Sequence, residues 1–63
     1  MTRAELIELV DCNDEKKQVK FLLSVEDGDF PDRWFQLAMQ YDCAFITVEE
    51  ALLGMLASFP DNN

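Results

Sequence analysis

Apolar residues recur at intervals of three and four positions along most of the chain, which is the spacing of an amphipathic helix. This spacing predicts four helices, over residues 3–10, 14–25, 31–41 and 48–59. Short polar breaks separate them, so neighbouring helices are expected to pack antiparallel or crossed. The predicted fold is all-α, a compact bundle of three to four short helices in a single domain, residues 1–63, with 59–63 as a frayed tail.

Two of the expected helices begin with the same capping pattern. Thr2 and Glu5 are spaced as a capping box, in which the hydroxyl and the carboxylate each accept a hydrogen bond from the other residue's backbone. Thr47 and Glu50 repeat that spacing before the last helix. The pattern predicts helix starts at both places.

Two other segments are expected to connect helices. Segment 26–32 is acidic, with Gly28 suited to a helix end and Pro31 to the first position of the next helix. Segment 42–46 is apolar without helical periodicity, which predicts either a buried turn or an extended connector.

The size of the chain limits how much it can enclose. A domain of 63 residues buries only about 60% of the surface that its unfolded form exposes, so disulfides, a metal or a second subunit are the usual supports. Cys12 and Cys43, without any histidine, are too few ligands for a zinc site. Because the first residues lack the features of a secretion signal and no run of about 18 apolar residues occurs, a cytoplasmic protein with free thiols is expected. One disulfide between the two cysteines is the alternative.

Charge restricts the class of partner. Thirteen acidic residues against five basic ones give a net charge of −8, and no basic residue follows Arg33. Binding to nucleic acid or to an anionic membrane requires the opposite sign, so neither is expected. The acidic surface is suited to a partner protein with a basic surface, although charge can also serve solubility alone.

The composition also offers little for catalysis or metal binding. Histidine, the usual general base, is absent, and no glycine-rich phosphate loop occurs. A calcium loop counted from Asp27 would need a glutamate at its twelfth place, where Ala38 stands. We therefore expect no enzyme, no cofactor and no metal.

The last helix has more apolar residues than one narrow face can hold. Residues 51–59 contain no charge, and if the other apolar positions serve the core, Leu53 and Leu56 point elsewhere. Such residues mark a surface for a partner or for a second copy, unless the other helices cover them. Gly54 weakens this helix by about 1 kcal/mol relative to alanine, which suggests that something packs closely against it.

The third helix poses a related question. Trp34 and Phe35 are adjacent and so point about 100° apart, which favours one in the core and the other as a binding anchor. A wide core face with aromatic edges is the alternative. Phe35 and Met39 form a second apolar strip beside the main one. The candidate partner-binding residues are four anchors and five acidic residues of a rim: Trp34, Phe35, Leu53, Leu56, Asp27, Asp29, Asp32, Glu49 and Glu50.

Three stretches, 19–27, 34–38 and 45–52, are similar to a known family in their order of residue types. Together they resemble the small proteins first noted beside nitrogen-fixation genes, which include leader segments of ribosomally made, modified peptides. The chain departs from that pattern because Asp42 stands in place of a glycine and one residue is inserted between Phe45 and Thr47. No Gly-Gly cleavage site follows. The resemblance implies a leader-like segment that a modifying enzyme recognises.

The sequence as a whole favours a non-enzymatic module that regulates or inhibits a partner protein through an apolar patch with an acidic rim. Two alternatives stay open. One is an inhibitor of the kind that phages direct against host proteins, which imitates nucleic acid and binds a basic DNA- or RNA-binding protein. The other is the leader-like recognition segment. The partner can also be a second copy of the chain.

Overall fold

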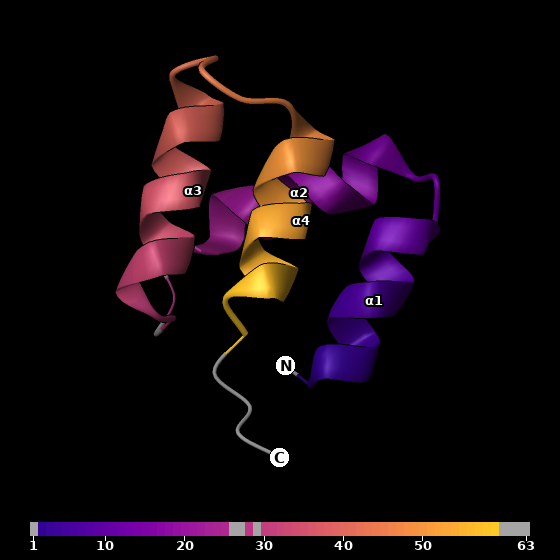
Figure 1. Cartoon of the computed structure of the whole chain (residues 1–63). Coiled ribbons are helices and arrows are strands. Elements are labelled where there is room, and N and C mark those ends of the chain that lie inside the picture. The colour runs from indigo at the N-terminus through magenta and orange to yellow at the C-terminus, as the bar shows by residue number, and fades with distance from the viewer. Residues whose placement is uncertain (1, 26–27, 29, 60–63) are drawn as a thin grey trace.

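A computed structural model describes residues 2–25, 28 and 30–59, and all secondary structure in that part of the chain is helical (Figure 1). The helices are α1 (Arg3–Asp11), α2 (Glu15–Val25), α3 (Asp32–Asp42) and α4 (Val48–Ala57). The predicted all-α bundle is confirmed, and each helix lies within two residues of its expected range.

Both predicted capping boxes are formed. In the first, the Glu5 backbone N–H donates to the Thr2 hydroxyl at 3.2 Å, and the Thr2 N–H donates to the Glu5 carboxylate at 2.8 Å. Thr47 and Glu50 form the same pair of bonds at 3.1 and 2.9 Å. Bonds from Thr2 hold the pKa of the Glu5 carboxyl below its usual range, because they favour the charged form. The starts of α1 and α4 are therefore determined by local residues.

A side chain of α2 closes the end of α1. Asn13 adopts a left-handed backbone with φ 55°, a conformation that asparagine tolerates. The turn directs α2 back across α1, where the Gln18 amide donates to the carbonyls of Leu9 at 2.9 Å and Val10 at 3.4 Å. Both carbonyls belong to the last turn of α1, where Leu9 also accepts the Cys12 N–H at 3.4 Å, so the contact helps to cap α1 and fixes the corner.

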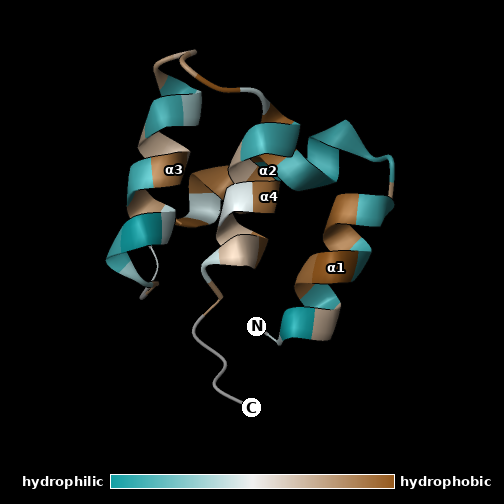
Figure 2. Ribbon diagram, viewed as in Figure 1, coloured by the Kyte–Doolittle hydropathy of each residue, from teal (hydrophilic) through white to brown (hydrophobic). Residues whose placement is uncertain are grey.

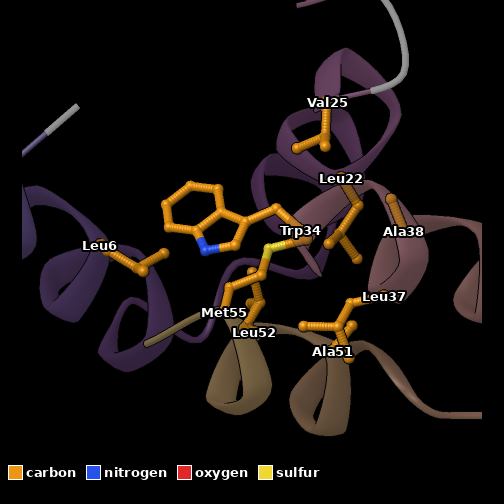
Figure 3. Close-up of a cluster of buried hydrophobic side chains, with 9 residues drawn as sticks. All are labelled: Leu6, Leu22, Val25, Trp34, Leu37, Ala38, Ala51, Leu52 and Met55. Carbon is orange, nitrogen blue, oxygen red and sulfur yellow. The ribbon is translucent and has the colours of Figure 1, made fainter. Parts of the chain in front are cut away.

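Helix α4 is the central element. In Figure 1, α3, α4 and α1 lie side by side and α2 crosses behind them, and α4 contacts each of the other three helices. The buried side chains all come from these contacts (Figure 3): Leu6, Leu22, Val25, Trp34, Leu37, Ala38, Ala51, Leu52 and Met55.

Trp34 occupies the middle of this core and is only 2% exposed. Three aromatic rings surround its indole, with centroids 5.7 Å away for Phe30, 6.2 Å for Phe21 and 5.6 Å for Phe59. The indole Nε1 has no hydrogen-bond partner in the described part of the chain. Such an orphan donor costs about 1–3 kcal/mol. Packing of the large ring must offset this cost.

These contacts correct two predictions. Trp34 was a candidate binding anchor, but its ring is enclosed by this chain and offers no surface to a partner. Phe59 was assigned to the frayed tail, but it is half-buried against Trp34 because α4 ends just before it and the chain turns inward. The remainder of the expected tail, residues 60–63, lies outside the described residues.

Gly54 has a partner within the chain. A Cβ built on this glycine would lie 3.0 Å from both terminal methyl carbons of Leu37, closer than side chains normally approach. The glycine therefore lets α3 pack closely against α4. The close neighbour expected from the sequence is Leu37, so Gly54 needs no second protein to explain it.

Two expectations about connectors are refined. Pro31 has ψ 147°, an extended value, so it is the N-cap of α3 and not its first helical residue. Gly28 follows α2, and its N–H donates to the Val25 carbonyl at 3.4 Å. Three of the acidic residues expected in this linker, Glu26, Asp27 and Asp29, lie outside the described residues.

Cys12 and Cys43 are both exposed free thiols, as expected. Within the described ranges, each helix is too short or too polar to cross a membrane.

We predict that Gly54→Leu destabilises the fold by about 1–3 kcal/mol, because the new side chain must displace the buried Leu37 from its contact. Urea unfolding followed by circular dichroism measures this change. Ala57→Leu is the matched control, since Ala57 is an exposed position of the same helix. Equal unfolding midpoints for the two variants would show that the close approach of α3 and α4 is not needed.

Candidate functional site

The most exposed apolar side chains on α3 and its following turn are Phe35, Met39 and Phe45, here called the α3 strip. Phe35 and Met39 are four residues apart and lie on one side of the helix. Their exposed fractions are 40% and 50%, and that of Phe45 is 79%. An aromatic ring exposed to this extent gains almost nothing from folding, so its position requires another explanation.

A tight turn at the end of α3 presents Phe45. The Phe45 N–H donates to the Gln40 carbonyl at 2.9 Å, and the Ala44 N–H donates to the Tyr41 carbonyl at 2.9 Å. This pair of bonds is the Schellman motif, in which the residue after the helix cap is left-handed. Ala44 has φ 63°, a conformation that usually belongs to glycine. The turn reverses the chain and leaves Phe45 beside Met39.

Hollows border the Phe45 ring on both sides. One, of about 190 Å³, is lined by Gln36, Met39, Gln40, Cys43 and Phe45. The other has about 440 Å³, with Tyr41 and Ile46 among its lining residues, and both hollows are open to solvent to a similar degree. The surface of the smaller hollow is almost entirely apolar, because Gln36 and Gln40 line it with the aliphatic parts of their side chains. It is suited to an apolar side chain.

Charge around the α3 strip is acidic. Asp32 begins α3 and Asp42 ends it, and both are exposed. Arg33 is the last basic residue of the chain, and it lies about 200° around the helix from Phe35, on the opposite side. Helix α3 therefore has a carboxylate at each end, and the side of α3 that carries the α3 strip has no basic side chain.

A second apolar surface lies over the seam between α1 and α4. It consists of Ile7, which is 39% exposed, Leu53, which is 48% exposed, and the half-buried Leu56, and is here called the α1–α4 face. Hydrophobic colour appears on both helices in the view of Figure 2. The prediction that Leu53 points away from the core is confirmed. Leu56 does so only in part, because one side of it packs on the core.

The predicted anchors therefore do not form one patch. Leu37 faces α4 at Gly54, and Phe35 lies about 200° away from Leu37 around α3, so the side chain of Phe35 is directed away from α4. Leu53 lies on another helix and borders α1. Phe35 and Leu53 consequently belong to separate surfaces, and Trp34 belongs to neither.

The predicted acidic rim is also divided. Asp32 lies near the α3 strip, whereas Glu49 and Glu50 are exposed at the start of α4. The Glu50 carboxylate already accepts the Thr47 N–H, so part of its hydrogen-bonding capacity serves the helix. Asp27 and Asp29 lie outside the described residues.

Sequence reasoning did not include Met39 and Phe45 among the site residues. The signals were present: Met39 belonged to the second apolar strip of its helix, and Phe45 lay in the aperiodic apolar segment. Of the two alternatives expected for that segment, a buried turn or an extended connector, it forms a turn, but Phe45 is exposed because the left-handed Ala44 directs the following residue outward.

The described residues contain no group of three or more Cys, Asp or Glu side chains arranged to hold a metal ion. Comparison of the chain with protein-family models, with curated proteins and with solved structures finds no match in any of the three. The resemblance to the nitrogen-fixation-associated family stays a prediction.

We predict that Ala44→Gly stabilises the protein by about 0.5–1 kcal/mol, because glycine removes the strain of a left-handed alanine at a smaller entropic cost. Thermal and urea unfolding measure the change. The same substitution at Ala57, the last helical residue of α4, should give no gain in stability, because a right-handed helical position disfavours glycine by up to about 1 kcal/mol. A loss of stability at both positions would contradict the role assigned to the turn.

Proposed function

We propose that this protein is a non-enzymatic binding module that regulates a partner protein by docking it on the α3 strip. The observation that carries the proposal is the 79% exposure of Phe45 beside Met39, at the edge of a hollow of about 190 Å³. Clustered apolar side chains on the surface of a small protein usually mark an interaction site. Aromatic residues are also frequent among the few that supply most of the binding energy.

The surroundings of the strip indicate the chemistry of the partner. The smaller hollow has room for an apolar side chain, and its surface is almost entirely apolar. Asp32 and Asp42 favour basic residues on either side of that anchor. The net charge of −8 would also speed the approach of a basic partner at low salt. The proposed partner segment therefore has one apolar side chain flanked by lysine or arginine.

The proposal assigns no catalytic step to the chain. Histidine is absent from the sequence, and the Thr47 hydroxyl and Glu50 carboxylate, which both line the larger hollow, are engaged in the capping box of α4. Regulation would follow from occupancy alone, because a bound partner has its own apolar segment covered. The exposed thiols Cys12 and Cys43 stay reduced in the cytoplasm, which is the compartment that we propose.

Selection from a library of random displayed peptides tests this proposal without knowledge of the natural partner. We expect the immobilised protein to enrich peptides with one aromatic or aliphatic anchor and at least two basic residues. A selected peptide should bind Phe45→Asp at least about tenfold more weakly, because the variant loses the apolar contact and gains a charge at the hollow. Fluorescence anisotropy measures both affinities, and Leu53→Asp is the control that should bind normally.

Other outcomes would reject the proposal. Failure to enrich any peptide, or equal affinity for wild type and Phe45→Asp, would exclude docking on the α3 strip. The salt dependence of peptide binding distinguishes docking on the α3 strip from the alternative of a nucleic-acid mimic, whose affinity would rest on charge alone. If the affinity of the protein for the selected peptide falls about 10³-fold between 50 and 200 mM salt, the mimic is favoured, since purely electrostatic binding behaves in this way.

A further inference from the structure

We infer that the α1–α4 face binds a second copy of this chain and forms a two-fold symmetric dimer. This face is separate from the α3 strip, so the inference does not rest on the proposed function. It starts from the exposed fractions of Ile7, 39%, and Leu53, 48%, which the chain itself leaves uncovered.

The directions of α1 and α4 determine which residues of this face lie at the same height along the two helix axes. Figure 1 shows α1 and α4 running in opposite directions. Val10 lines one hollow together with Glu49 and Leu52, so the end of α1 lies beside the start of α4. Helices rise about 1.5 Å per residue, which brings Ile7 to the level of Leu53. By the same count, Arg3 lies at the level of Ala57, about 12 Å from Glu49 along the helix axes.

Charges at the two ends of the face are opposite. Arg3 is exposed at one end, whereas Glu49 and Asp11 are exposed at the other. Their distance along the seam prevents Arg3 from reaching Glu49 within one chain. Ile7 and Leu53 lie between these ends, so the face is positive at one end, apolar in its middle and negative at the other end.

A face with this order of charges is complementary to itself. In a two-fold dimer, a contact from one residue of the first copy to another residue of the second copy is always repeated with the two copies exchanged, so contacts occur in pairs. A two-fold axis that lies in the interface and perpendicularly bisects the line from Arg3 to Glu49 brings each Arg3 over the partner's Glu49. Both ion pairs form in the same arrangement, and the aliphatic residues of the two copies meet between them.

Size and charge indicate how strong this dimer is. A standard interface covers about 800 Å² on each partner, close to a fifth of the 4464 Å² surface of this chain, whereas the α1–α4 face offers three aliphatic side chains, of which Leu56 is half-buried. Two copies also carry −8 each and repel one another. We therefore expect a dissociation constant of about 10–500 μM, in the range of weak interfaces.

Sedimentation equilibrium of the full chain between about 10 μM and 1 mM tests the dimer, because association of this strength changes the mean mass across that range. Leu53→Asp should raise the dissociation constant at least about tenfold while the helical circular dichroism persists. If that variant loses helicity, Ile7→Gln on α1 tests the same face. Phe35→Asp on the α3 strip is the control, and it should dimerise like the wild type.

Charge reversal tests the geometry. Arg3→Glu and Glu49→Lys should each weaken the dimer about tenfold, because each replaces two attractive pairs by two repulsive ones. The double variant, Arg3→Glu with Glu49→Lys, restores opposite charges and should recover the wild-type constant to within about threefold. A mass equal to the monomer at every concentration would overturn the inference. A double variant that dimerises no better than the single ones would overturn it as well.

Discussion

The limited volume that four short helices can enclose governs this molecule. Among the residues that the structure describes, nine side chains are buried, and all four helices contribute to them, with α4 at the centre. In the same part of the chain, six other large hydrophobic residues keep more than a third of their surface in contact with solvent. Burial stabilises a fold roughly in proportion to the apolar area removed from water, so these six contribute much less than the nine. Their cost in solubility is offset by the strong net charge.

The enclosed volume is filled by one large aromatic residue and one close helix contact. Trp34 supplies most of the aromatic packing, at the cost of a buried N–H without a partner in the described part of the chain. Gly54 lets Leu37 approach α4, so α3 is held by shape as well as by area. With Trp34 and Leu37 directed inward, the geometry of a helix turns Phe35 and Met39 outward. The α3 strip is thus a consequence of how α3 is anchored.

Local features of the sequence were sufficient to predict the helices. The capping boxes at Thr2 and Thr47 involve residues three positions apart, so no tertiary information is needed to recognise them. Choosing between Trp34 and Phe35 for the core did need tertiary information, because each lies on an apolar strip of α3 and the two strips are about 100° apart. The left-handed Ala44 carries no signal of its own, since glycine is the usual residue there. For that reason the exposure of Phe45 could not be predicted, whereas the other two residues of the α3 strip, Phe35 and Met39, were recognisable as a second apolar strip.

The central claim is that the α3 strip does not serve the fold. The direct measurement is the free energy of unfolding of the double variant Met39→Gln with Phe45→Gln, obtained from urea titrations followed by circular dichroism. The structure predicts a change of less than about 1 kcal/mol, because substitutions of exposed residues usually have small effects. A loss of about 2–5 kcal/mol, the size typical of truncated core residues, would contradict the claim and place these side chains among those that hold the fold together.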